Sequence, residues 1–153
     1  MKKIAVFPGS FDPITRGHEN IIKRALPLFD QIIIAIGENQ DKKNFFSLEK
    51  RIEFLRLVFK DEPGITIETY SGLTVEFCKK VNAGYILRGL RTSADFEFER
   101  SIGQVNKKLL PNIETVFFLT TPEYTSINSS VVRDIIRHGG DPSQFIPEGL
   151  IIK

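Results

Sequence analysis

Apolar runs rich in β-branched residues alternate along the chain with segments of helical periodicity. Runs at 3–7, 31–37, 65–70, 85–89 and 115–120 predict strands, and segments at about 17–28, 48–60, 74–82, 95–110 and 129–138 predict helices. Most of the strand runs are continuous rather than alternating, which is typical of strands covered on both faces. Five strand–helix units in sequence therefore predict an α/β fold, a Rossmann-like, doubly wound, five-stranded parallel sheet with helices on both faces.

Several helix ends carry their own signals. Ser47 is placed to cap the helix at 48–60, and the serine hydroxyls of "SSVVRDIIRHGG" are placed to cap the last helix. The glycines that close this stretch predict its end, so we interpret His138 as a C-terminal helix residue without a catalytic role. Cys78 lies on an apolar helix face and is interpreted as part of the core.

Composition limits the possible functions. The 153 residues carry a formal net charge of +2, one cysteine and two histidines, which fits a single domain over 1–153 without an internal disulfide or a structural zinc site. The first apolar run ends at Pro8, too early for a signal peptide or a spanning helix. We therefore expect a cytoplasmic protein without membrane contact. No nucleic-acid-binding motif is present, so no nucleic-acid partner is expected.

In a parallel sheet, ligands bind at the carboxyl ends of the strands, so the segments after the strands are the candidates for function. The first is "PGSFDPITRGH", which matches neither a Walker A loop nor a dinucleotide fingerprint. Its glycines admit a phosphate group close to the backbone, and Ser10 and His18 offer donors at the start of a helix. The segment predicts a phosphate site with His18 as donor. The alternative is a plain turn with a histidine at a helix start.

Three further strand ends carry polar residues. After 31–37, Lys42 and Lys43 are either a solvated pair or include a phosphate ligand, and the sequence alone does not choose between Lys42 and Lys43 as that ligand. At the end of 85–89, Arg88 and Arg91 flank a glycine, an arrangement that suits two neighbouring phosphates. The alternative is that both are ordinary surface arginines. One carboxylate of the acidic run that follows is a candidate to accept from a ribose hydroxyl. After 115–120, the stretch 128–130 is either a helix cap, an anion site or both.

These motifs together resemble a known family. "FPGSFDPITRGH" is similar to the (T/H)xGH signature of the nucleotidyltransferase superfamily, and "INSSVVR" is similar to its serine-rich second signature. With "DKKNFFSLEKR" and "LRGLRTSADFEFE", the resemblance covers nearly the whole chain and points to the bacterial phosphopantetheine adenylyltransferases. Thr15 stands where cytidylyltransferases of the superfamily carry histidine, which argues against these.

The resemblance implies transfer of the adenylyl group of ATP to 4′-phosphopantetheine, giving dephospho-coenzyme A and pyrophosphate, by in-line attack without a protein general base. It implies catalytic roles for Ser10, Lys42, Arg88 and His18, the last as transition-state stabiliser. The 4′-phosphopantetheine ligands would be Ser10, Lys42, Thr74 and Arg88. The ATP ligands would be Ser10, Phe11, His18, Gly89, Leu90, Arg91, Glu99, Tyr124, Thr125, Ser126, Ile127, Asn128, Ser129 and Ser130.

The same resemblance implies Mg²⁺ held by ATP phosphates and water, a homo-hexamer, and coenzyme A as a feedback ligand. The chain departs from the family pattern at Ser10, where relatives commonly carry threonine, and at Asn128, where they commonly carry serine.

Two rival functions remain. One is nucleotidyl transfer to another acceptor, such as nicotinate mononucleotide, and the other is a nucleotide- or coenzyme-A-binding regulator without catalysis.

Overall fold

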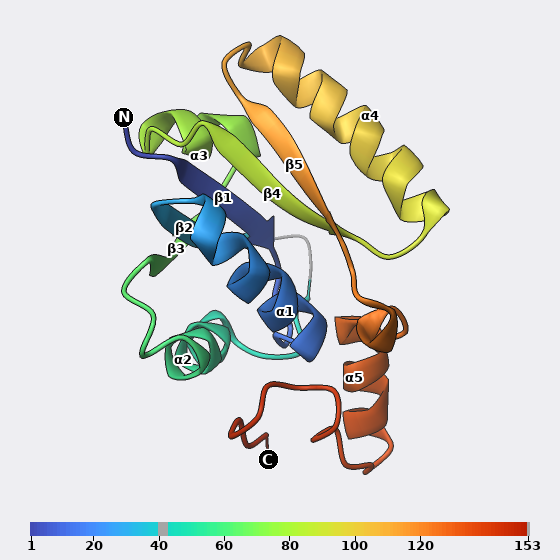
Figure 1. The fold of residues 1–153 in the computed structure, drawn as a ribbon. Helices are drawn as coiled ribbons and strands as arrows, with labels where there is room; N and C mark the ends of the chain where they lie inside the picture. The colour runs from blue at the N-terminus through green and yellow to red at the C-terminus, as the bar shows by residue number, and fades with distance from the viewer. Residues whose placement is uncertain (40–42, 153) are drawn as a thin grey trace.

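In a computed structural model, which describes residues 1–39 and 43–152, the chain folds around a five-stranded parallel sheet (Figure 1). The strand order is β3-β2-β1-β4-β5, so β1 lies at the centre and the chain winds outward in both directions. This confirms the predicted fold class. The strands are β1 (Ile4–Gly9), β2 (Gln31–Gly37), β3 (Ile65–Tyr70), β4 (Tyr85–Leu90) and β5 (Glu114–Leu119).

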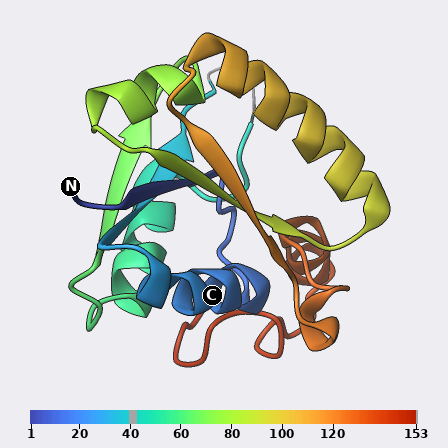
Figure 2. The ribbon, with the colours of Figure 1, turned by 45° about the horizontal axis from the view of Figure 1, so that its top comes forward.

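Helices cover both faces of this sheet (Figure 2). On one face lie α1 (Arg16–Ala25) and α2 (Leu48–Val58), and on the other lie α3 (Thr74–Lys80) and α4 (Ser93–Leu109). The last helix, α5 (Ser129–Arg137), follows β5 and a short 3₁₀ turn, η2 (Pro122–Tyr124). No helix among residues 1–39 and 43–152 is long and apolar enough to cross a membrane.

One helix end and one helix cap differ from the sequence prediction. The helix expected at 17–28 ends as an α-helix at Ala25 and continues as a 3₁₀ turn, η1 (Leu26–Leu28). Pro27 causes this change because it has no N–H for the α-helical hydrogen bond. The last helix is capped by Asn128 and not by a serine, because the Asn128 side chain accepts the Val131 N–H at 2.9 Å. The predicted cap at Ser47 is confirmed, since its side chain accepts the Lys50 N–H.

The sheet separates the core into two parts. On the α1 and α2 face, Leu55 and Ile22 are fully buried against the strands, together with Ile146 of the C-terminal segment. Arg16 holds this segment, since its guanidinium donates to the Ile146 carbonyl at 2.7 Å. On the opposite face, Cys78 is fully buried, which confirms its predicted place in the core.

The helix α4 packs less closely than the others. Its one buried residue is Glu99, while several of its large apolar side chains are exposed. The exposed ones are Phe96, Phe98, Ile102, Val105 and Leu109. A hollow described below lies between this helix and the sheet.

The core of the α1 and α2 face makes a stability prediction. We expect Leu55→Ala to lower the free energy of unfolding by about 2–5 kcal/mol, because it removes a fully buried side chain and leaves a cavity. Leu57, on the same helix, is 49% exposed. The matched Leu57→Ala should therefore change stability by only about 0.5 kcal/mol. Urea denaturation measures both, and equal losses would contradict the orientation of α2.

Candidate nucleotide-transfer site

A pocket of about 340 Å³ opens at the carboxyl edge of the sheet, between the ends of β1 and β4. This is the edge at which the sequence predicted a site. Most of the predicted nucleotide ligands line it: Ser10, Phe11, His18, Gly89, Arg91, Glu99, Tyr124, Ile127, Asn128 and Ser129, with Arg88 beside them. Four predicted ATP ligands do not line this pocket, namely Leu90, Thr125, Ser126 and Ser130.

His18 is held by the start of its own helix. The Thr15 side chain caps α1 by accepting the His18 N–H, and the Thr15 N–H donates to Nδ1 of His18 at 3.0 Å. Since Nδ1 accepts this hydrogen bond, the proton of the neutral imidazole is on Nε2. Burial, followed by the positive charges of Arg88 and Arg91, lowers the pKa of His18 from 6.5 to about 4. At neutral pH the side chain therefore presents an uncharged N–H donor.

Two phenylalanine rings support the imidazole from behind. The Phe11 ring lies edge-on to His18 with centroids 5.0 Å apart, and Phe7 packs in the same way against Phe11 at 5.6 Å. Phe11 is buried and adopts φ +48°, in the left-handed region that non-glycine residues seldom occupy. A Cβ on Gly9 would lie 3.0 Å from this ring, so the glycine leaves the space that Phe11 fills.

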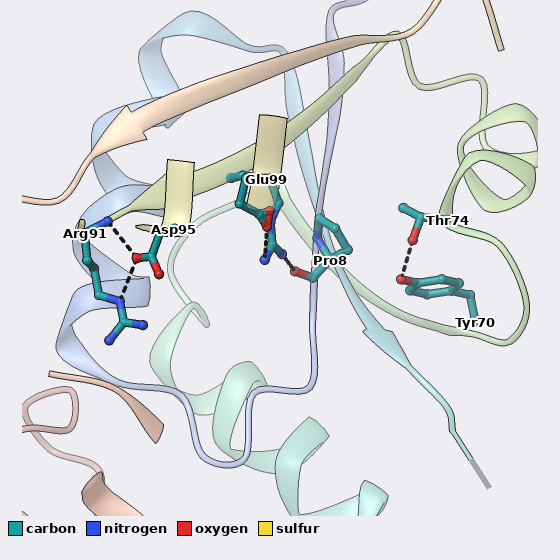
Figure 3. Close-up of polar contacts among 7 residues, drawn as sticks. Pro8, Tyr70, Thr74, Arg91, Asp95 and Glu99 are labelled. Atoms are coloured by element: carbon teal, nitrogen blue, oxygen red, sulfur yellow. Dashed lines mark hydrogen bonds and ion pairs between the residues drawn. The ribbon is translucent and has the colours of Figure 1, made fainter. Parts of the chain in front are cut away.

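Acidic side chains of α4 hold the arginines of the β4 end. The Arg88 guanidinium pairs with Glu99, with an N–O distance of 2.7 Å, and donates to the Pro8 carbonyl at 2.6 Å. Asp95 accepts the Arg91 backbone N–H at 3.1 Å and pairs with its guanidinium at 3.4 Å (Figure 3). Glu99 therefore holds Arg88, a contact that the sequence did not predict.

The start of α5 forms another wall of the pocket. The Ser129 hydroxyl donates to the Pro13 carbonyl at 2.7 Å, and the Ser130 hydroxyl accepts from Arg133 at 3.0 Å. The Ser129 bond attaches α5 to the loop after β1, whereas the Ser130 bond lies within α5, and with both hydroxyls engaged neither serine caps the helix. Asn128 both caps α5 and lines the pocket.

Two further hollows adjoin the pocket. One follows the ends of β1, β2 and β3 and contains Ser10 and Tyr70. The other, of about 230 Å³, lies beneath α4 and contains Thr74, Arg88 and Glu99. The Thr74 and Tyr70 hydroxyls lie 2.9 Å apart (Figure 3), and both residues line this hollow. The structure thus brings three predicted phosphopantetheine ligands, Ser10, Thr74 and Arg88, to adjoining hollows. Lys42, the fourth, lies outside the described residues.

Two buried charged residues beside the site were not singled out in the sequence. Asp12 accepts the N–H groups of Phe45 and Phe46, at 2.7 and 2.8 Å. Arg51 donates to the Ser10 and Phe46 carbonyls. The apolar period of α2 contained a signal for Arg51, because it shares a helix face with the buried Phe54 and Leu55.

Within the described ranges, 1–39 and 43–152, no group of three or more histidine, cysteine or carboxylate side chains is arranged to hold a metal ion. The carboxylates nearest the pocket are also engaged, since Asp95 and Glu99 pair with arginines. A metal that accompanies a nucleotide would find its ligands mainly on that nucleotide and on water.

Comparisons with known proteins agree with this geometry. The family described as cytidylyltransferase-like matches residues 6–135. The chain is 56% identical over 149 residues to the phosphopantetheine adenylyltransferase of Flavobacterium psychrophilum, covering 97% of this chain and 98% of that protein. The enzyme of the same name from Flavobacterium johnsoniae is also 56% identical, over 97% of each chain.

Among solved structures, the chain resembles a bifunctional NMN adenylyltransferase/ADP ribose pyrophosphatase from Francisella tularensis. The TM-score is 0.75 at 19% identity, over 98% of this chain and 46% of that one, so this likeness supports the fold alone. The two Flavobacterium relatives, by contrast, match from end to end at high identity. The chain therefore belongs to the cytidylyltransferase-like family and, within it, to the phosphopantetheine adenylyltransferases.

Proposed function

We propose that this chain transfers the adenylyl group of ATP to 4′-phosphopantetheine, giving dephospho-coenzyme A and pyrophosphate, the penultimate step of coenzyme A synthesis. Its full-length identity with phosphopantetheine adenylyltransferases supports this reaction. The observation in the site that carries the proposal is the neutral Nε2–H donor of His18, set in a pocket with two arginines. Such a pocket suits a phosphoryl group that gains charge on its oxygens as it reacts.

The attacking group is a phosphate oxygen, which is already anionic at neutral pH. No proton has to be removed from it, so the site needs positioned donors rather than a general base. We assign His18 to an α-phosphoryl oxygen, where it forms a hydrogen bond that strengthens as charge develops. Arg91 and the start of α5 at Ser129 lie on the pocket wall and would hold the departing pyrophosphate.

The acceptor would occupy the two hollows that adjoin the nucleotide pocket. Ser10, which borders both the nucleotide pocket and the adjoining hollow, would lie between the two substrates. Arg88 and Lys42 would hold the acceptor phosphate, and Thr74 would line the space for the pantetheine arm beneath α4. A phosphate bound here would share the Arg88 guanidinium with Glu99, since these two side chains form an ion pair.

We further propose that Mg²⁺ accompanies ATP and neutralises part of its charge, bound through phosphate oxygens and water.

The exposed apolar side chains of α4, with Phe98 at 69% exposure, suit burial against further copies of the chain. This supports the homo-hexamer that the resemblance implies. Dephospho-coenzyme A and coenzyme A would bind the same hollows as product and feedback ligand, in the cytoplasm.

The proposed role of His18 makes a first kinetic prediction. His18→Ala should lower kcat about 10²–10³-fold, because it removes a preorganised donor to the transition state, with a much smaller change in the KM for ATP. Pyrophosphate release with Mg-ATP and 4′-phosphopantetheine measures it, with nicotinate mononucleotide as an alternative acceptor. His138, exposed at the end of α5, provides the matched control, and His138→Ala should be as active as the unchanged chain. Equal losses in kcat and in ATP affinity would contradict the role.

The lowered pKa makes a second prediction. In His138→Ala, which leaves His18 as the only imidazole, NMR titration of the folded chain should find the transition near pH 4 rather than 6.5. Since unfolding lets His18 take up a proton between these values, its contribution to stability is complete above pH 6.5 and falls as the pH drops toward 4. A titration near pH 6.5 would show that His18 is charged in part at the working pH and would contradict the neutral donor.

Lys42 makes a third prediction. Lys42→Ala should raise the KM for 4′-phosphopantetheine about tenfold or more while changing the KM for ATP little, because a charged hydrogen bond to the acceptor phosphate is lost. Lys43→Ala, which removes the same charge from the neighbouring position, is the matched control. An unchanged KM in Lys42→Ala, or an equal rise in both variants, would refute the assignment.

A further inference from the structure

Arg51 is a buried cation whose partners are backbone carbonyls. Its side chain rises from the first turn of α2, and the residue is 4% exposed. One terminal nitrogen donates to the Ser10 carbonyl at 2.9 Å, and Nε donates to the Phe46 carbonyl at 3.1 Å. Among the described residues, no carboxylate lies within ion-pair distance of it. A buried charge is costly, and here hydrogen bonds to two backbone carbonyls offset that cost in place of an ion pair.

The bond to Ser10 determines the direction of the next N–H group. The Ser10–Phe11 peptide is trans, since the cis bond of the described chain is Asp12–Pro13, so its C=O and N–H point in opposite directions. Arg51 draws the carbonyl toward α2, and Arg51 itself does not line the nucleotide pocket. The Phe11 N–H is therefore turned away from α2, and Phe11 lines that pocket together with His18.

Two observations indicate that this N–H is held for a ligand. Within the described part of the chain, the Phe11 N–H has no hydrogen-bond acceptor, although the residue is 2% exposed. Its backbone also adopts the left-handed conformation, which costs free energy that the surroundings must offset. A buried donor without a partner beside a phosphate pocket is suited to a phosphate oxygen.

Asp12 completes the support from the opposite side. Its carboxylate accepts from the N–H groups of Phe45 and Phe46, so the Phe46 residue is held by Asp12 at its N–H and by Arg51 at its C=O. The loop after β1 and the segment before α2 are thereby joined by two buried groups of opposite charge. A shift of the segment before α2 would therefore also move the loop after β1.

We propose that Arg51 is a positioning residue for adenylyl transfer. It orients the Ser10–Phe11 peptide so that the Phe11 N–H donates, beside His18, to the transferred phosphoryl group, without touching substrate itself. This proposal rests on the proposed function, since it assigns a further donor to the same reaction. It predicts that the geometry of the guanidinium fork matters, and not merely its charge.

The test compares three variants by pyrophosphate release and thermal unfolding. Arg51→Met removes the fork and keeps an apolar stem of similar length, and it should lower kcat about 10- to 100-fold, because a displaced donor loses this much in the transition state. The KM for ATP should change less than about threefold. Arg56→Met makes the same change at an exposed position of α2 and should retain the kcat of the unchanged chain. Arg51→Lys keeps the charge without the fork and should resemble Arg51→Met.

Hydrogen exchange supplies a readout that does not depend on turnover. At saturating Mg-ATP, exchange in the peptide over 8–13 should slow in the unchanged chain and in Arg56→Met, and this protection should be lost in Arg51→Met. Wild-type kcat in Arg51→Met, full activity in Arg51→Lys, or a loss of activity that follows the unfolding temperature would each overturn the proposal. If the chain does not catalyse adenylyl transfer at all, the unchanged chain and Arg56→Met will also release no pyrophosphate. This outcome is distinct from a failure of the Arg51 proposal.

Discussion

The hydrogen bond from the Thr15 N–H to Nδ1 of His18 determines both where α1 begins and what the imidazole offers at its other nitrogen. A helix start has N–H groups without intrahelical partners, and here a histidine satisfies one of them. Because the acceptor is Nδ1, the remaining proton faces the pocket on Nε2. Local folding and the chemistry of the site therefore depend on the same atoms. The positive charges of Arg88 and Arg91 add to the effect of burial, because both favour the neutral form of His18.

The central place of β1 explains why so many elements reach this loop. The strand is flanked by β2 and β4, so its carboxyl end faces α4, α5 and the segment before α2. Backbone carbonyls of the loop accept from Arg88 at Pro8, Arg51 at Ser10 and Arg133 at Asp12. Three arginines thus bind the end of β1 and the loop that follows it. Their common effect is to fix the backbone of this segment and to place positive charge near a pocket for anions.

Most of the fold was predictable because the strands of a doubly covered sheet are continuous apolar runs, and all five were found within a few residues. The exceptions have local causes. Pro27 divides the first helix, and the Asn128 amide replaces the expected serine caps because the Ser129 hydroxyl is engaged by Pro13. The site was predictable as far as residues follow a strand end and carry a donor, as His18 and Arg91 do. Arg51 and Asp12 were missed because their partners are backbone atoms 41 and 33 residues away, which no side-chain pattern records.

The most direct test of this account is a crystal structure with Mg²⁺ and a non-hydrolysable ATP analogue. We predict an α-phosphate oxygen within hydrogen-bond distance, about 3 Å, of Nε2 of His18, with the Phe11 N–H directed at the same phosphate. The Arg51 bond to the Ser10 carbonyl should be unchanged in that complex. An analogue bound with its α-phosphate out of reach of His18 would contradict the central claim that this imidazole is a neutral donor to the transferred group.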